Sequence, residues 1–115
     1  MFHVNQKDCA YRFGDSGPKY LMRGPRAGMG IARLKPGEDF GNHYHEAMEE
    51  NFYVLKGTIE SVVDGTPYIG SPGDLYHMEP GESHYLRNVG DEEAIVVFFL
   101  TPFQEGDKVN TPLIR

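Results

Sequence analysis

The chain has 115 residues, of which 39% are hydrophobic, and a formal net charge of -6. This length predicts a single domain over residues 1–115 with one hydrophobic core, and the negative charge argues against nucleic acid as a partner. No run of about 18 apolar residues predicts a membrane span, and with no signal-peptide pattern and a lone cysteine, Cys9, a cytoplasmic location is expected.

The N-terminal part of the chain is basic, whereas the remainder is acidic. Residues 1–35 carry seven Lys/Arg and two Asp/Glu, a net charge of +5, and residues 36–115 carry four and fifteen, a net charge of -11. One interpretation is that an N-terminal segment, residues 1–28, packs on the acidic body or on a partner chain. The other is that some of its arginines meet an anionic ligand.

Short strand-like runs separated by turn residues follow, and no long stretch has the apolar spacing of a helix. Asp64-Gly65 is a strong hairpin signal, and Pro72-Gly73 is a turn pair. Strands are predicted at residues 30–34, 51–57, 58–63, 66–70, 74–78, 84–89 and 94–100. Their regular spacing is typical of an all-β sandwich or barrel. We therefore expect a barrel over residues 29–101 and an irregular tail over residues 102–115.

The last predicted strand, AIVVFFL at residues 94–100, has no polar residue on either face. A strand of this kind needs cover on both faces. One face is expected to lie in the barrel interior. Cover of the other by a second copy of the chain predicts a homodimer, and cover by the N-terminal segment is the alternative.

Residues with metal-ligand chemistry gather in and after the stretch HYHEAMEE. His43 and His45 share a face if they lie on a strand, and two neutral imidazoles can converge on one ion. Glu49 and Glu50 open the next predicted strand, and the alternation of apolar residues does not decide which of them faces inward. His84 follows a Pro-Gly turn and opens another strand. Three histidines and a glutamate from three strands predict a site for a first-row divalent metal.

At these residues the sequence resembles the cupin family, whose first motif reads G-x5-H-x-H-x3,4-E-x6-G. This motif is matched by Gly37, His43, His45, Glu50 and Gly57. The second motif, G-x5-P-x-G-x2-H-x3-N, is matched by Gly73, Gly81, His84 and Asn88, with Glu79 in place of the proline. The fit selects Glu50 over Glu49, and the one departure falls in a turn.

The resemblance implies an antiparallel jelly-roll β-barrel, or double-stranded β-helix. It also implies one divalent transition metal (Mn, Fe, Ni, Co or Zn) held by His43, His45, Glu50 and His84. Single-domain members often form dimers, which agrees with the homodimer expected from residues 94–100. Function does not follow from the fold, because the family includes isomerases, epimerases, dioxygenases, decarboxylases, lyases and non-catalytic ligand binders.

Other residues are predicted to contact the ligand from their place on the strands. Phe52 and Leu86 share a face with Glu50 and His84, so both are expected to line the metal cavity. Met29 and Ile31 are further candidates for the wall. Arg33, which shares a face with them, is the first choice as partner of an anionic group, and another N-terminal arginine is the alternative. His77 is a candidate general base, or a structural or surface histidine.

The function predicted from these residues is a metal-dependent enzyme acting on a small oxygenated molecule, such as a sugar derivative or a hydroxy or keto acid. The metal would act as a Lewis acid that polarises a carbonyl group. An iron-dependent dioxygenase and a non-catalytic, metal-assisted ligand-binding module are the alternatives. In each case an anionic or oxygen-chelating small molecule is the expected partner, because one carboxylate leaves a divalent ion with residual positive charge.

Overall fold

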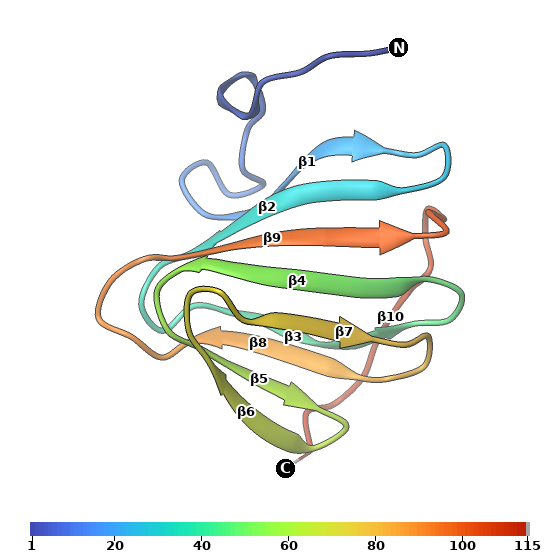
Figure 1. Cartoon of the computed structure of the whole chain (residues 1–115). Helices are drawn as coiled ribbons and strands as arrows, with labels where there is room; N and C mark the ends of the chain where they lie inside the picture. Colours follow the sequence, from blue (N-terminus) through green and yellow to red (C-terminus); the bar gives the residue numbers. More distant parts are fainter. Residues whose placement is uncertain (115) are drawn as a thin grey trace.

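Two antiparallel β-sheets face each other in the part of the chain that the structure describes, residues 1–114 (Figure 1). In this computed structural model, one sheet has the strand order β1-β2-β9-β4-β7 and the other the order β10-β3-β8-β5-β6. The strands of the first are β1 (Gly17–Arg23), β2 (Gly28–Leu34), β9 (Ala94–Thr101), β4 (Glu49–Lys56) and β7 (Leu75–Met78). Those of the second are β10 (Lys108–Asn110), β3 (Asp39–His45), β8 (His84–Asn88), β5 (Ile59–Val63) and β6 (Thr66–Gly70). All recorded strand pairings are antiparallel, and the architecture is a jelly-roll β-barrel.

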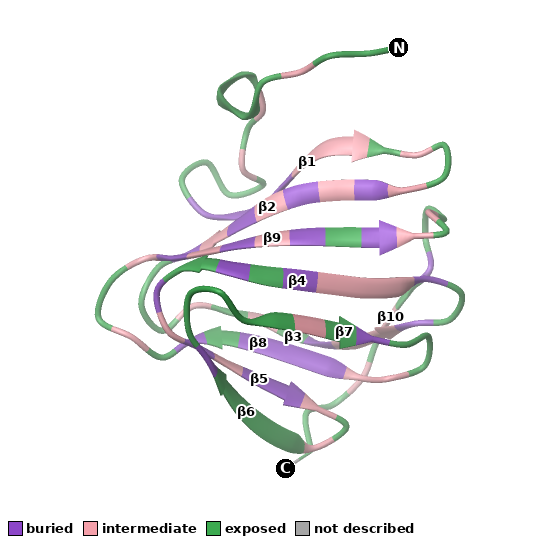
Figure 2. Ribbon diagram, viewed as in Figure 1, coloured by how far each residue is buried: buried purple, intermediate pink, exposed green. Residues whose placement is uncertain are grey.

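The hydrophobic core lies between the sheets and takes every second residue of a strand (Figure 2). Strand β9 buries Ala94, Val96, Phe98 and Leu100, while the residues between them are half-buried or exposed. The second sheet adds Ile59 and Leu86 to the same cluster. One face of the apolar run at residues 94–100 therefore lies in the core, as expected. The opposite face lies on the outside of the sheet.

The all-β prediction is confirmed, and each of the seven predicted strands overlaps an observed strand with ends shifted by at most two residues. The two ends of the chain differ from the prediction. The N-terminal segment contributes β1, which pairs with β2, besides a single 3-10 turn at Gln6–Asp8. The tail contains β10, so the expectation that residues 102–115 are irregular was wrong for this stretch. Three residues are too few to show an alternating pattern, and β10 forms because it pairs with β3.

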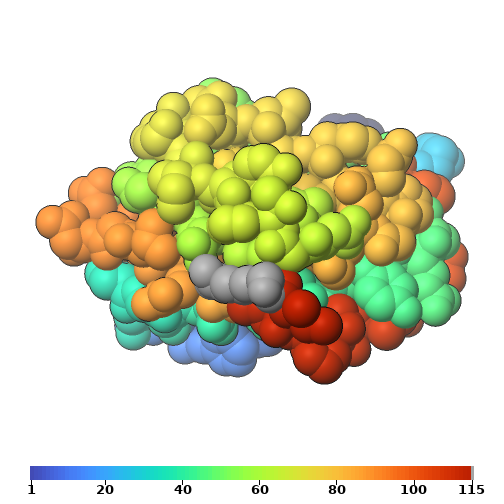
Figure 3. Space-filling view, turned by 90° about the horizontal axis from the view of Figure 1, so that it is seen from below, coloured from blue at the N-terminus to red at the C-terminus, as the bar shows by residue number. Residues whose placement is uncertain are grey.

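The C-terminal residues run beside the second sheet and are hydrogen-bonded to it. The backbone N–H of Thr111 donates to the carbonyl oxygen of Asn42, and the Asn42 side chain donates to the carbonyl oxygen of Pro112. Figure 3 shows these residues, in red, next to the β5–β6 hairpin, where Ile114 approaches Gly65. Within residues 1–114, no helix reaches the length and apolar character that crossing a membrane requires.

Candidate metal centre

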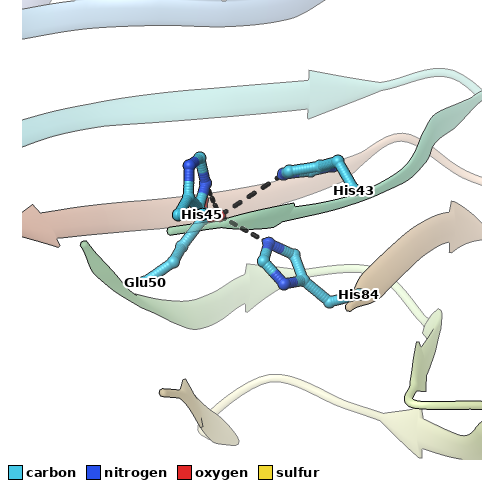
Figure 4. Close-up of side chains that lie close together, drawn as sticks. All are labelled: His43, His45, Glu50 and His84. Carbon is cyan, nitrogen blue, oxygen red and sulfur yellow. Dashed lines mark hydrogen bonds and ion pairs between the residues drawn. The ribbon is translucent and has the colours of Figure 1, made fainter. Parts of the chain in front are cut away.

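Four side chains with metal-ligand chemistry meet between the two sheets (Figure 4). Strand β3 supplies His43 and His45, strand β8 supplies His84, and Glu50 comes from β4 in the opposite sheet. One donor atom from each of the four lies within 4.8 Å of the others. Since His43 and His84 are direct partners in the β3–β8 register, the ladder itself holds their rings together. The structure thus brings together the four residues predicted as ligands.

Three imidazole nitrogens converge on a single carboxylate oxygen. The Nε2 atoms of His84, His45 and His43 lie 2.7, 3.1 and 3.6 Å from Oε1 of Glu50. The opposite ring nitrogens of two histidines face backbone carbonyl oxygens: Nδ1 of His43 is 2.8 Å from Gly41 and Nδ1 of His84 is 3.1 Å from Glu82. A carbonyl oxygen can only accept, so these Nδ1 atoms carry the hydrogen, and Nε2 of the neutral ring presents a lone pair.

Lone pairs that face a carboxylate oxygen repel it unless a proton or a cation lies between them. Three neutral imidazole nitrogens and one carboxylate oxygen form a donor set that suits first-row divalent metals. Hydrogen bonds from Nδ1 to a backbone carbonyl are the usual outer support of a metal-bound histidine. Nδ1 of His45 is buried and has no hydrogen-bond partner within residues 1–114. By its chemistry, the cluster fits a divalent metal ion.

Burial and the hydrogen bonds within the cluster both affect its protonation. Burial lowers the pKa of His43, and the hydrogen bond to Glu50 offsets this effect only in part. Burial alone would raise the pKa of Glu50. The three imidazoles, which donate to the carboxylate whenever their Nε2 atoms carry a proton, outweigh burial, so the pKa of Glu50 lies well below the usual range. Near neutral pH, the expected state is a neutral His43 beside an ionised Glu50, which is the state that binds a metal.

The turn between β3 and β4, residues 46–48, joins two of the four cluster residues and is held by the carboxylate of Asp107. The backbone N–H groups of Glu46, Ala47 and Met48 all donate to this carboxylate, over distances of 2.9 to 3.2 Å. Asp107 is only 5% exposed. Asp107 immediately precedes β10, and the pairing of β10 with β3 places its carboxylate beside the turn between His45 and Glu50.

A cavity of about 300 Å³ opens beside His45 and Glu50. Its apolar wall includes Phe40, Phe98 and Leu100, and its charged groups besides Glu50 are Arg12, Asp39 and Lys108. Tyr20 also lines it and packs edge-on against Phe98 with ring centres 5.0 Å apart. Burial, reinforced by the negative charge of Glu50, raises the pKa of Tyr20. Its hydroxyl therefore stays protonated and can donate a hydrogen bond to a ligand.

The residues predicted to line the metal cavity on β4, β7 and β8 lie in the hydrophobic core or on the surface instead. Phe52 and Leu86 point inward as expected, but they belong to the hydrophobic core, and the Phe52 ring centre is 6.4 Å from that of His84. His77 is exposed on β7, where its Nδ1 contacts the Asn51 side chain and its Nε2 lies 3.3 Å from Glu79. The position of His77 matches the alternative of a surface histidine and does not fit a base inside the cavity.

Strand β2 has the opposite orientation to the one expected. Met29, Ile31 and Arg33 lie on its outer face, and Arg33 forms an ion pair with Glu93. The first inner positions of β2 are glycines, because a Cβ at Gly30 would lie 2.4 Å from the Phe98 ring and one at Gly28 would lie 2.5 Å from the Phe103 ring. The prediction that Arg33 meets a ligand in the cavity was therefore wrong.

Sequence reasoning missed most of the residues that line the cavity. Arg12 belongs to the N-terminal segment for which an anionic ligand was one interpretation, but it was not singled out. Tyr20 lies on a strand that the turn signals did not reveal, and Lys108 lies in the supposedly irregular tail. The sequence contained one usable signal, the basic charge of residues 1–35. No local pattern marked Lys108 or Asp107.

The jelly-roll barrel, with three histidines and a glutamate between its sheets, places this chain in a class of small β-barrel proteins with a candidate metal site. Residues 30–100 match the family described as "Cupin domain", and the chain belongs to this family. Cupins commonly bind a divalent metal, and members of the family bind small molecules and often oligomerise.

Relatives of known name and solved structure agree with this assignment. The chain is 40% identical over 74 residues to "Polyketide synthase CurC" of Streptomyces cyaneus, a match that covers 64% of this chain and 48% of that protein. It is 34% identical over 70 residues to an "Oxalate-binding protein" of Thermotoga maritima, covering 59% of this chain and 58% of the other. The chain thus spans about half the length of the curated relatives that it matches.

The fold is also that of a protein of solved structure from Klebsiella pneumoniae. That protein is described as an uncharacterized conserved protein with a double-stranded beta-helix domain. The TM-score is 0.82 at 19% identity, over 96% of this chain and 97% of the other. The likeness at this level of identity concerns the fold alone, and it agrees with the double-stranded β-helix expected from the sequence.

Proposed function

We propose that this chain is a metal-dependent enzyme that acts on a small oxygenated molecule, such as a sugar derivative or a hydroxy or keto acid. His43, His45, Glu50 and His84 would hold one divalent transition metal, which supplies Lewis-acid polarisation of a carbonyl oxygen when bound. The observation that carries the proposal is the convergence of three Nε2 atoms on Oε1 of Glu50 at the edge of a ligand-sized cavity.

The remaining groups in the cavity favour catalysis over binding alone. Tyr20 offers a hydroxyl that remains protonated, and Asp39 offers a carboxylate that also accepts a hydrogen bond from Tyr85 at 2.8 Å. Acid and base groups apart from the metal ligands are what proton transfer to and from a substrate requires. A wholly apolar lining would instead favour an iron-dependent dioxygenase or a non-catalytic binding module.

The names of the relatives point in the same chemical direction. One is named as a polyketide synthase protein and another as an oxalate-binding protein. Polyketide chains carry repeated carbonyl oxygens, and oxalate carries two adjacent carboxylates. Both names agree with an oxygen-rich ligand for this chain, and neither specifies its substrate.

Metal-dependent binding of oxalate is the expected result of this proposal. A divalent ion with one carboxylate ligand keeps a formal charge of +1, which is poorly screened in a partly buried site. Oxalate should therefore bind to the metal-loaded protein and lose most of its affinity when the metal is stripped by a chelator. Calorimetry on both forms makes this comparison, and equal affinity in the two forms would contradict the proposed role of the metal.

Hydrogen exchange in heavy water separates an enzyme from a binding module. Polarisation of the carbonyl of 2-oxobutyrate acidifies the hydrogens on its neighbouring carbon. An acceptor such as Asp39 takes up the proton, and a solvent deuteron replaces it. Proton NMR follows the exchange as the loss of the signal from these hydrogens. The metal-loaded protein should accelerate this loss, whereas the stripped protein should not. Binding without any acceleration would favour the non-catalytic module.

We also propose that the chain forms a homodimer through the outer face of the first sheet. The register places Ile31, Val97, Tyr53 and Leu75 side by side across β2, β9, β4 and β7. Tyr53 is 42% and Leu75 67% exposed in the single chain. Such a row can anchor an interface of standard size, about 800 Å² per partner.

Light scattering at micromolar concentration should give the mass of a dimer for the wild-type chain. Val97→Glu puts a charge in the middle of the apolar row and should shift the chain to monomer. Ile69→Glu is the matched control, because Ile69 is 65% exposed but lies on β6 in the other sheet. A wild-type chain that is monomeric at this concentration would rule out the homodimer.

A further inference from the structure

Two basic side chains from opposite ends of the chain line the cavity beside the candidate metal centre. Arg12 precedes β1, and Lys108 is the first residue of β10. Within residues 1–114, neither side chain forms an ion pair. Three other bases of the N-terminal region form ion pairs: Arg23 with Glu105, Arg33 with Glu93, and Lys35 with Asp15. Arg12 and Lys108 therefore line the cavity without a direct ion-pair partner among the described residues.

The backbone holds both residues at the cavity. Arg12 lies in a tight loop whose backbone N–H groups bond back to the chain, from Arg12 to Pro18 and from Phe13 to Ser16. Lys108 is the direct register partner of His45 across the β10–β3 ladder. Direct partners point to the same side of a sheet with Cβ atoms about 5 Å apart. Lys108 is thus placed next to one of the four residues of the metal cluster.

The charges around the cavity do not balance once a metal is present. Arg12 and Lys108 offset Asp39 and Glu50, so a divalent ion would leave the lining with a formal charge of +2. The wall between the charged groups is apolar, with Phe98 and Leu100 among its residues. At about 300 Å³, the cavity is at the small end of ligand pockets. A small ligand with two anionic ends separated by a short carbon chain matches this distribution.

We infer that Arg12 and Lys108 form an anion subsite, which binds a second carboxylate of a ligand whose other end reaches the metal centre. This inference rests on the proposed function, and it narrows the substrate class to small dicarboxylates with a hydroxy or keto group at one end. Charge-assisted hydrogen bonds from arginine and lysine are the strong interactions that such a carboxylate would make. Because the side chains of Arg12 and Lys108 are exposed, they can reach the second carboxylate without any change in the strands.

Malate and 2-hydroxybutyrate form a matched pair of probes. Both have four carbons and the same hydroxy-acid end, and only malate has a second carboxylate. On the metal-loaded wild-type protein, malate should bind at least about tenfold more tightly than 2-hydroxybutyrate in calorimetry. The double variant Arg12→Gln/Lys108→Gln should lose this preference, while its metal content stays unchanged. Arg26→Gln is the control, because it removes an arginine that does not line the cavity.

The outcomes separate the two proposals. If neither acid binds in a metal-dependent manner, the proposed function fails. If both acids bind with the same affinity to the wild-type protein, or if malate keeps its preference in the double variant, the anion subsite is wrong while the metal-dependent function stands. A thermal melt of the double variant should match the wild type, because both substituted side chains are exposed.

Discussion

His84→Ala should leave the protein unable to retain a metal through dialysis against a chelator. His84 is 4% exposed, and its Nε2 makes the shortest contact to Glu50 in the cluster, 2.7 Å. Its removal leaves two histidines and a glutamate around a gap in the site. Loss of an outer partner of a metal ligand already weakens metal binding about 10- to 100-fold, so loss of a ligand should exceed about 100-fold. Elemental analysis after dialysis measures the effect.

His77→Ala is the matched control for this experiment. His77 is also a histidine beside glutamates, with its Nδ1 3.4 Å from Glu49, but it is exposed on β7. We expect this variant to retain the same metal content as the wild type. Circular dichroism of the stripped His84→Ala protein should show the β-rich spectrum of the stripped wild type. A folded His84→Ala protein that keeps one equivalent of metal would contradict the assignment of His84 as a ligand.

The motif spacing predicts the four residues of the cluster because the spacing of residues along a strand determines which of them share a face. His43 and His45 share a face by their separation of two, and the turn signals place His84 at the start of a strand. The choice between Glu49 and Glu50 was open from alternation alone, and the family pattern decided it. In the structure Glu50 is the residue that meets the histidines, and Glu49 contacts His77 and Asn51.

The cavity could not be predicted in the same way, because its lining depends on contacts between distant parts of the chain. Larger apolar residues usually face a core, so Met29 and Ile31 were expected to face inward. On β2, however, the Phe98 and Phe103 rings fill the space above Gly30 and Gly28. Met29 and Ile31 therefore lie on the outer face. Residues about 70 positions away decide which face of β2 lies inside. A local sequence pattern does not contain this information.

The C-terminal residues illustrate the same limit and also connect the fold to the site. Residues 102–115 have no strand signal, yet they supply the Asp107 carboxylate that holds residues 46–48 and the Lys108 side chain that lines the cavity. Both placements follow from the pairing of β10 with β3. The segment that was expected to be irregular thus borders the candidate metal centre on the side of His45.

Asp107→Ala should be strongly destabilising. The backbone N–H groups of Ala47 and Met48 lose their acceptor; that of Met48 is buried, whereas that of Ala47 can regain water. The Glu46 N–H keeps the backbone carbonyl oxygen of Asp107 as an acceptor. An unsatisfied buried donor costs about 1–3 kcal/mol, and each bond to a charged group contributes about 1.5–3 kcal/mol. We expect the free energy of unfolding of the stripped protein to fall by about 2–4 kcal/mol in urea titration. Asp74→Ala, which removes an exposed acceptor from Ser71, should cost about 1 kcal/mol or less.

Metal affinity shows whether Asp107 positions the ligands or only stabilises the fold. The turn that it holds joins His45 to Glu50, so a looser turn spreads the two donors over a wider range of positions. Asp107→Asn keeps the shape and one acceptor oxygen, and should remain folded at low temperature. Under those conditions, we expect its affinity for a divalent metal to fall about 10- to 100-fold, as for other residues that orient ligands. Asp74→Ala should bind metal like the wild type, and a folded Asp107→Asn protein with unchanged metal affinity would limit Asp107 to a structural role.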